Sequence, residues 1–346
     1  MTGTQQEDAR RTILLGGRVI TMQPDCRNDG EGVLVEGDRI VRIIRRAEVE
    51  TLAGAQTRVI DLHDRILLPG FVDVHAHAEV VCRTTYGTVD CRAPECSSVG
   101  DVLDALSSSL KTQGRFDWVV GQANLFFDRK LKEGRLPTRA ELDKVSRDAP
   151  VALRAGGHIT VLNSKALEVA GIDRHFVPPE YSVTGLPEVV RDENGDPTGV
   201  VKEMDTLLPF PGQSGEMLRA ALREGLHEYF TRFGVTTIGE ISETVEGIQC
   251  LDAMGQTGEL ASSMRVYLWS PGTLKLEAGC DWRSHLKLQT GERDLRIQGI
   301  KIFSDGGFSA KSAAVTCPYV GQGGSCGALA FSRYFFRRAY ALTQDT

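Results

Sequence analysis

The sequence predicts an α/β fold, and two observations along its 346 residues support that class. Short apolar or alternating runs, separated by turn residues, fill residues 12–68 and are typical of hairpins in a small antiparallel sheet. After residue 217, a helical pattern alternates with short apolar strands, which favours βα units and a parallel sheet. We therefore expect a β-rich domain over residues 1–68 and an α/β domain over residues 69–346.

The predicted elements follow in chain order. Strands are expected at residues 13–15, 19–20, 32–36, 40–44, 59–60, 71–77, 118–120, 151–153, 235–238, 266–269 and 297–303. Helices are expected at residues 102–110, 217–233 and 331–342. In the second of these, one stripe carries the apolar residues Leu218, Leu222, Leu226, Tyr229 and Phe233. Residues 178–199 are rich in Pro, Gly and acidic residues and predict a loop with a hairpin that turns at 193–196.

Composition excludes several classes of protein. Hydrophobic residues make up 41% and charged residues 25% of the chain, as in an ordinary globular protein with room for a core. A net charge of −6 argues against non-specific binding to nucleic acid and offers no basic patch for a membrane. Residues 1–11 are polar, without the apolar segment of a signal peptide, so we expect a cytoplasmic location and no membrane partner.

The most informative stretch is residues 69–77, Pro-Gly-Phe-Val-Asp-Val-His-Ala-His. Side chains two apart on a strand share a face, so His75 and His77 should leave the end of this strand together. Asp73 lies on the same face, one pleat below. Two neutral imidazoles a few ångströms apart form half of a metal site.

Lysine and cysteine positions leave two alternatives open. Lys301 falls inside a strand of buried type that meets Ser-Asp-Gly-Gly, so it is either functional or an edge-strand lysine that reaches solvent. The eight cysteines include no Cys-x-x-Cys pair and are expected to be reduced. A metal cluster of Cys82, Cys91 and Cys96 is the alternative for three of them.

Several blocks of sequence, in order from about residue 13 to 319, resemble the amidohydrolase superfamily. The resemblance is to its amidohydrolase-3 (YtcJ-like) branch, which includes N-substituted formamide deformylases. Residues 69–77 match the first barrel strand of that branch, and residues 59–62 its lead-in, although Asp64 stands where Gly is common. The other matching blocks are Gly157-His158, 163–167, 170–172, 192–199 with Glu203, 234–237 and 300–306.

The resemblance implies a metal-dependent hydrolase on a TIM-type barrel, with a small β-sandwich to which the N-terminal residues contribute. It implies one or two divalent ions, usually Zn²⁺, with His75 and His77 as ligands of one ion. Lys301, carboxylated by CO₂, is the implied bridging and catalytic residue, with Glu240 as the alternative bridge. Asp305 completes the implied catalytic pair.

His158 and Glu203 are implied to bind substrate or to support the leaving nitrogen. The alternative for both is a helix-capping or surface role. The implied partner is a small-molecule substrate, with a possible homodimer and no nucleic acid.

The chain departs from the family in its number of barrel strands. Four are found, at about 71–77, 234–240, 264–269 and 297–304, whereas a (β/α)₈ barrel has eight. No histidine follows residue 306. We expect an incomplete barrel with an insertion at about 78–230, comparable to the N-terminal two-thirds of such an enzyme.

Two functions follow as hypotheses. The first is hydrolysis of a non-peptide C–N bond, of amide or N-formyl type, by metal-activated water. The second is a truncated, inactive remnant that acts at most as a binding or scaffold protein.

Overall fold

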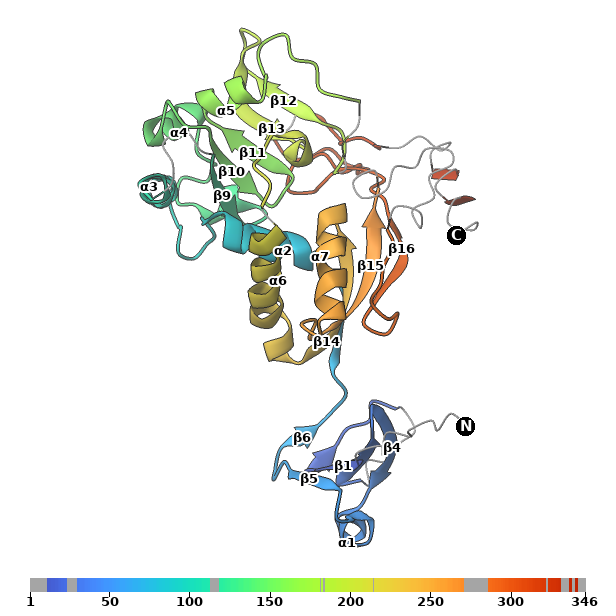
Figure 1. Ribbon diagram of the computed structural model, residues 1–346. Coiled ribbons are helices and arrows are strands. Elements are labelled where there is room, and N and C mark those ends of the chain that lie inside the picture. Colours follow the sequence, from blue (N-terminus) through green and yellow to red (C-terminus); the bar gives the residue numbers. More distant parts are fainter. Residues whose placement is uncertain are drawn as a thin grey trace. The chain divides into compact units, whose positions relative to one another are not determined.

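The chain divides into two compact units, Met1–Phe71 and Val72–Thr346 (Figure 1). The computed structural model describes residues 11–23, 30–112, 118–180, 182, 184–213, 215–270, 286–321, 323–330, 336–337 and 340–341. The helix predicted at residues 331–342 lies largely outside these ranges. Each unit has its own sheets and core.

The first unit is a small β structure. Its elements are β1 (Arg11–Leu15), β2 (Arg18–Val19), β3 (Gly32–Glu36), β4 (Arg39–Ile44), η1 (Arg46–Glu48), α1 (Val49–Leu52), β5 (Arg58–Asp61) and β6 (Ile66–Leu67). The main sheet has the order β4-β3-β1-β5, and β2 pairs with β6. Its core contains Ile13, Leu15, Leu34 and Ile44, with Val49 and Leu52 packed against them.

The pairing in this unit differs from the prediction at one strand. β3 pairs antiparallel with both β1 and β4, as expected of hairpins, and Gly37 at the β3–β4 turn has a φ of +59°. β5, however, pairs parallel with β1. A parallel partner needs a crossover between strands, and η1 and α1 lie in the segment between β4 and β5. The sheet is therefore mixed, because this connection is not a hairpin.

The second unit has two sheets and most of the helices. Its elements are β7 (Phe71–Ala76), α2 (Ala78–Gly87), β8 (Val89–Asp90), α3 (Val99–Leu110), β9 (Val119–Ala123), η2 (Phe127–Lys130), α4 (Arg139–Val145), β10 (Val151–Ala155), β11 (Ile159–Leu162), α5 (Ser164–Val169), β12 (Glu188–Arg191), β13 (Pro197–Lys202), η3 (Asp205–Leu207), α6 (Gly215–Tyr229), η4 (Thr231–Phe233), β14 (Val235–Ser242), α7 (Val245–Gln256), β15 (Ser263–Trp269) and β16 (Leu295–Lys301).

Four strands form the sheet that carries the histidine pair, in the order β16-β15-β14-β7. β14, β15 and β16 run parallel, which confirms the parallel sheet predicted from the alternation after residue 217. β7 lies so close to β14 that a Cβ on Gly239 would be 2.4 Å from the carbonyl oxygen of Val74. Glycine at position 239 is therefore required by the close approach of the two strands.

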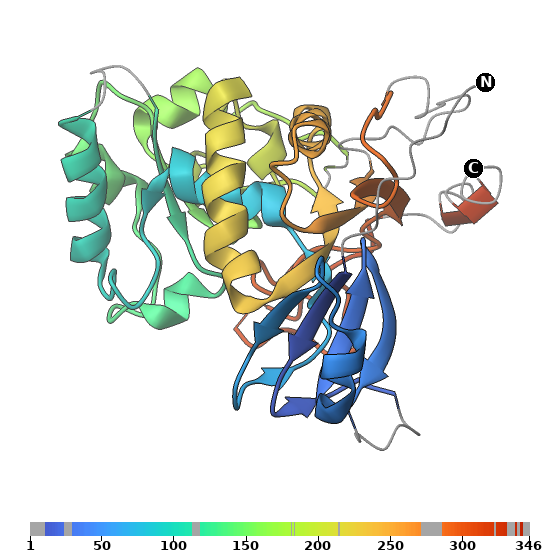
Figure 2. The ribbon, with the colours of Figure 1, turned by 60° about the horizontal axis from the view of Figure 1, so that its bottom comes forward.

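Helices α2, α6 and α7 pack on this sheet. The stripe predicted for α6 is confirmed for Leu218, Leu222 and Leu226, which are buried in one core with Ile238 and Val266 of the sheet. The helix itself ends at Tyr229, and η4 follows; Gly234, with a φ of +84°, ends that turn. Figure 2 shows α6 (yellow) crossing α2 (cyan), and the two helices are in contact.

A six-stranded sheet occupies the segment between β7 and β14, in the order β12-β13-β11-β10-β9-β8. It is mixed, because β8, β9 and β10 pair parallel while β10–β11, β11–β13 and β12–β13 pair antiparallel. The hairpin predicted to turn at 193–196 is β12–β13, with Gly195 at a φ of +83°.

Cys82, Cys91 and Cys96 lie in two different cores of the described part of the chain. Cys82 is buried in the core of the four-stranded sheet, whereas Cys91 and Cys96 belong to the core of the six-stranded sheet. The alternative of a three-cysteine metal cluster is therefore wrong, because these side chains lie in two separate cores.

Among the described helices, none is both long enough and apolar enough to cross a bilayer.

Candidate active site

The two histidines lie where β7 ends and α2 begins. His75 is in the strand, and His77 is the N-cap residue of α2. Their ring centroids are 5.6 Å apart, so the strand brings the two imidazoles together as its alternation predicts. Burial lowers the pKa of His77 to about 4, and the positive charge of Lys301 lowers it further. His77 is thus a neutral imidazole, able to donate a lone pair, at any pH well above 4.

Lys301 is the last residue of β16 and lies over aromatic rings. Its Nζ is 4.6 Å from the ring centroid of Phe303 and 5.8 Å from that of Trp269. The same Trp269 ring meets His77 edge-on at 5.2 Å. The Trp269 ring therefore contacts both Lys301 and His77.

The environment of Lys301 bears on the two interpretations of this residue. β16 is an end strand of its sheet within the described residues, as the edge-strand alternative requires. The ammonium nevertheless lies against Phe303 and Trp269, and the side chain is only partly exposed. Burial lowers the pKa of Lys301. A lowered pKa increases the fraction of neutral amine, the form that can react with CO₂.

His158 and Glu203 form a buried pair. The Nδ1 of His158 is 2.8 Å from Oε2 of Glu203, and the two side chains are 18% and 0% exposed. The alternative of a helix cap or surface role is therefore not what the structure shows: both side chains are enclosed, and the pair joins the β10–β11 turn to the end of β13. His158 also meets Phe303 edge-on at 6.4 Å.

Glu203 is held by the segment that follows β16. Its Oε1 accepts hydrogen bonds from the Gly307 amide, at 3.0 Å, and from the Ser312 hydroxyl. Burial alone would raise the pKa of Glu203, but the hydrogen bonds and charge from His158, with those from Gly307 and Ser312, lower it below its usual value. A Cβ on Gly307 would lie 2.7 Å from the His158 ring, so this turn fits closely against the pair.

Asp305 lies in the same segment after β16, two residues before Gly307. Its Oδ2 accepts a hydrogen bond from the Ala314 amide at 2.9 Å, and its Oδ1 accepts one from the Ser304 hydroxyl at 3.0 Å. Its backbone forms a bridge with Leu329. In this structure, the contacts of Asp305 are thus those of a residue that shapes the loop after β16.

Glu240, the alternative bridging residue, lies in β14 and is fully buried. Its carboxylate oxygens accept hydrogen bonds from the backbone amides of Ala78, at 2.6 Å, and Glu79, at 3.1 Å. Burial raises the pKa of Glu240 to about 8 despite these amide donors. Both oxygens are therefore used in capping the first turn of α2.

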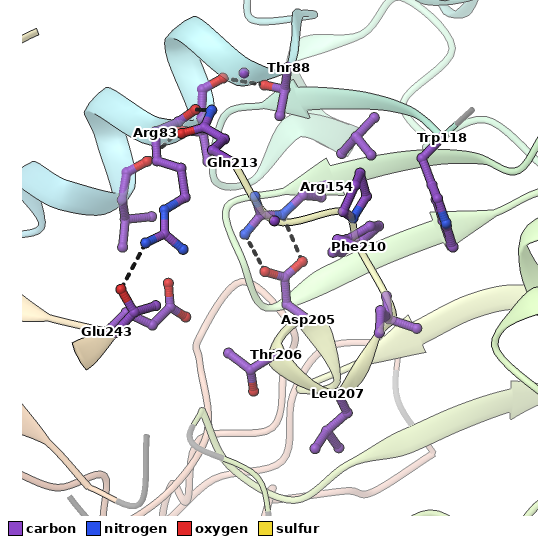
Figure 3. Close-up of a pocket in the computed structure, with 18 of the residues that line it drawn as sticks. Arg83, Thr88, Trp118, Arg154, Asp205, Thr206, Leu207, Phe210, Gln213 and Glu243 are labelled. Atoms are coloured by element: carbon purple, nitrogen blue, oxygen red, sulfur yellow. Dashed lines mark hydrogen bonds and ion pairs between the residues drawn. The ribbon is translucent and has the colours of Figure 1, made fainter. Parts of the chain in front are cut away.

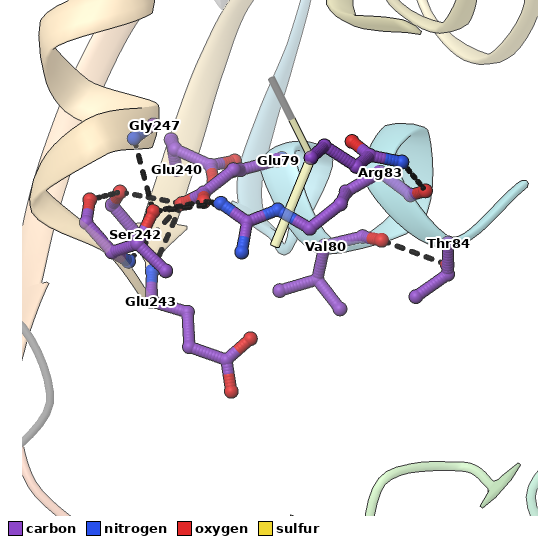
Figure 4. A network of polar contacts seen from close by, with 10 residues as sticks. Glu79, Val80, Arg83, Thr84, Glu240, Ser242, Glu243 and Gly247 are labelled. Atoms are coloured by element: carbon purple, nitrogen blue, oxygen red, sulfur yellow. Dashed lines mark hydrogen bonds and ion pairs between the residues drawn. The ribbon is translucent and has the colours of Figure 1, made fainter. Parts of the chain in front are cut away.

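The sequence prediction missed a second buried glutamate, which fixes α2 to the end of β14 (Figure 4). Glu79 accepts hydrogen bonds from the Ser242 hydroxyl, at 2.9 Å, and from the Glu243 and Thr244 amides, at 3.2 and 3.3 Å. It also accepts from the Thr244 hydroxyl and forms an ion pair with Arg83. The available sequence signal was the spacing of Glu79 and Arg83, one helical turn apart.

The chain is similar in sequence to known amidohydrolases. A sequence profile described as "Amidohydrolase family" matches residues 58–341. N-substituted formamide deformylase of Arthrobacter pascens is 32% identical over 196 residues, which are 56% of this chain and 34% of that protein. The putative amidohydrolase YtcJ of Bacillus subtilis is 27% identical over 315 residues, 89% of this chain and 56% of that protein.

Solved structures extend the likeness to the fold. Two crystal structures described as uncharacterized metal-dependent hydrolases, from Pyrococcus horikoshii and Pyrococcus furiosus, have TM-scores of 0.61 and 0.63, with identities of 21% and 23%. Each covers 96% of this chain, which in turn covers 63% and 65% of theirs. The chain thus spans between about a third and two thirds of the length of these relatives. With the profile matching most of its residues, the chain belongs to the amidohydrolase family.

Proposed function

We propose that this chain provides residues of a metal-dependent amidohydrolase site that cleaves a non-peptide C–N bond of amide or N-formyl type. The observation that carries the proposal is the imidazole pair of His75 and His77 at the end of β7, 5.6 Å apart, with Lys301 at the end of β16 connected to it through Trp269. Family membership and the printed names of the relatives support the same reaction class.

The residues present fit part of a divalent-ion site. Two imidazoles are ligands of the type that zinc prefers, and the lowered pKa of His77 keeps its lone pair free at neutral pH. Among the described residues, no cluster of three or more His, Cys, Asp or Glu side chains is arranged around one point. The proposed third ligand is Lys301, carboxylated on Nζ, because its Nζ lies against the Trp269 ring that also meets His77. We prefer it to Glu240, whose two oxygens already accept amides of α2.

When bound, a divalent ion such as zinc would lower the pKa of its water and polarise the substrate carbonyl. His158 and Glu203 have a separate role, which is to orient the substrate. In the tautomer whose Nδ1 donates to the Glu203 carboxylate, the Nε2 of His158 keeps its lone pair. Nε2 can then accept a hydrogen bond from the N–H of the scissile amide and orient it. The Gly307 amide and the Ser312 hydroxyl hold Glu203 for this task.

The same proposal includes an architecture. We infer that β7, β14, β15 and β16 belong to a TIM-type barrel, and that the first unit belongs to a small β-sandwich. The parallel order of β14, β15 and β16 supports a barrel, as do the positions of His77, Glu240 and Lys301 toward the strand ends, where such barrels have their active sites. The inactive-remnant alternative has the same fold but holds no stoichiometric metal.

A metal-binding experiment tests the proposal. The purified chain is loaded with zinc, dialysed and measured by elemental analysis, alongside the double variant His75→Ala/His77→Ala. The matched control is His175→Ala, an exposed histidine of the same unit. We expect zinc in the parent chain and in the control, and its loss in the double variant.

Equal zinc in all three proteins would remove the histidine pair from the proposal. Hydrolysis of simple N-formyl and N-acyl amines with added zinc tests the reaction separately. A chain that binds zinc at His75 and His77 without turnover would leave the site standing and would assign the chemistry to a longer protein. A chain that holds no zinc at this pair would favour the remnant alternative.

A further inference from the structure

A cavity of about 570 Å³ lies beside the candidate active site and does not include it (Figure 3). Its walls come from α2, from β9 and β10 of the six-stranded sheet, from the segment after β13 and from the end of β14. The side chains that matter to its chemistry are Arg83, Trp118, Arg154, Asp205, Phe210 and Glu243. None of His75, His77, His158, Glu203 and Lys301 lines it. The cavity is thus a separate space with its own set of charged groups.

The charges around this cavity do not balance. Arg154 forms a bidentate ion pair with Asp205, in which Nε donates to Oδ1 at 2.8 Å and Nη2 donates to Oδ2. Arg83 forms its ion pair with Glu79. Each guanidinium therefore already has a carboxylate. Glu243 is the additional carboxyl group, and its side chain has no hydrogen-bond or ion-pair partner among the described residues.

Glu243 is poorly solvated where it lies. Burial raises its pKa to about 7, and the nearby carboxylates of Asp205 and Glu79 raise it, while Arg154 and Arg83 act in the opposite direction. Figure 3 shows its carboxyl group directed into the space that Arg83 and Asp205 also border. A positive charge placed in that space would stabilise the ionised carboxylate, because opposite charges within a few ångströms attract strongly at a partly buried site.

An apolar wall completes the cavity. At the other side, the rings of Trp118 and Phe210 meet edge to face at 5.1 Å, and the Arg154 guanidinium lies 5.6 Å from the Phe210 centroid. The cavity therefore combines a carboxyl group without a partner and an aromatic wall.

We propose that this cavity binds a ligand with a single ammonium group on an aromatic or other apolar body. The ammonium is placed at the Glu243 carboxylate, and the body lies against Trp118 and Phe210. An ammonium supplies donors only, which suits a carboxylate without a partner. Aromatic faces bind both apolar groups and cations. The site is independent of the proposed hydrolysis, since it shares no lining residue with the histidine pair or Lys301.

The competing ligand would be an anion held by Arg83, whose Nε is buried without an acceptor. The charged groups around the cavity argue against an anionic ligand. Three carboxyl groups, those of Glu79, Asp205 and Glu243, surround two guanidiniums, so an anion would add a fourth negative group. A cation with one charge restores the balance.

The test is isothermal titration calorimetry on the full metal-free chain at pH 8 with four probes of matched size or charge. They are 2-phenylethylamine, 2-phenylethanol, ethylamine and 3-phenylpropanoate. We expect the first to bind at least tenfold more tightly than the next two, and the carboxylate to show no binding. Tighter binding of the carboxylate, equal binding of the alcohol, or no binding of 2-phenylethylamine would each overturn the proposal.

Two variants identify the residue responsible. Glu243→Gln keeps the shape of the side chain and the backbone amide that donates to Glu79, and it should weaken 2-phenylethylamine at least tenfold. Glu246→Gln is the matched control, because Glu246 is exposed at the start of α7 and outside the cavity. Equal weakening in both variants, or none in Glu243→Gln, would contradict the assignment. Circular dichroism confirms that both variants are folded.

The pH dependence gives an independent readout. The ammonium is charged throughout the range from pH 5 to 8, whereas Glu243 ionises near pH 7 in the free protein. The affinity should therefore fall by about tenfold for each pH unit below 7, and this dependence should vanish in Glu243→Gln. A flat profile in the parent chain would contradict the proposal. No metal or turnover is needed, so failure here is distinguishable from failure of the proposed hydrolase.

Discussion

The contacts of Glu79, a buried residue of α2, allow a prediction about the stability of the second unit. The change is Glu79→Gln, which keeps the size of the side chain but removes its charge. Glu79 is fully buried and accepts hydrogen bonds from Ser242, from the Glu243 amide and from both the amide and hydroxyl of Thr244, besides its ion pair with Arg83. In the variant, one acceptor oxygen becomes an NH₂ group that faces other donors.

The expected loss in the free energy of unfolding has two causes. A hydrogen bond to a charged group contributes about 1.5–3 kcal/mol, and the loss of one partner of a buried ion pair costs about 3–5 kcal/mol. These figures overlap, because Arg83 contributes to both, and its side chain is 31% exposed and can partly recover water. We therefore expect the free energy of unfolding of the second unit to fall by about 3–4 kcal/mol.

Tryptophan fluorescence during urea unfolding measures this quantity for the right part of the chain. All 3 tryptophans of the sequence, Trp118, Trp269 and Trp282, follow residue 72. Glu246→Gln, at an exposed position of α7, is the control and should change the free energy of unfolding by less than about 0.5 kcal/mol. A loss below about 1 kcal/mol in Glu79→Gln would show that these contacts do not stabilise α2 as the structure suggests.

Three further outcomes are expected. Lys301→Ala should abolish activity in any form of the enzyme that turns over, with partial recovery on adding short carboxylic acids; full activity in the variant would make Glu240 the next bridging residue to test. Leu222→Ala, at a position that is 0% exposed, should lower the free energy of unfolding by about 2–5 kcal/mol in the same urea assay. For Glu240, the folded pKa of about 8 lies above the usual value of 4.5, so the folded chain keeps a proton that the unfolded chain releases between these values. Stability should therefore fall as pH rises from about 5 to 8, and Glu240→Gln should flatten that slope; parallel profiles for the two proteins would contradict the assignment.

Local patterns predicted the parts of the fold that depend on one element at a time. The stripe of Leu218, Leu222 and Leu226 follows from helical period, and it packs on the sheet as expected. His75 and His77 follow from strand period in the same way, and their rings do lie close together. In each case the residues that act together are within one element, so the sequence alone contains the geometry.

Pairing between distant segments could not be predicted in this way. The parallel contact of β5 with β1 depends on how residues 45–57 cross over, which no hydrophobic pattern specifies. Glu79 gives an even clearer case. A glutamate in a helix usually faces water, and its burial depends on Ser242 and Thr244, more than 160 positions later. The hydrogen-bond acceptor is visible in the sequence, but its donors are known only once α2 and β14 are placed together.

α2 is the element that connects the two candidate sites. The residue at its N-cap is His77, one of the proposed ligands, and Arg83 lies six residues further along, in the wall of the cavity. Six residues of α-helix advance about 9 Å, so the two sites are neighbours that are too far apart to share one small ligand atom. Glu79 lies between them and fixes this stretch of helix to the end of β14, where Glu243 begins the opposite wall. Because the helix is anchored at this point, an ammonium bound at Glu243 can be recognised without displacing the imidazole pair, and each site can be tested in the absence of the other's ligand.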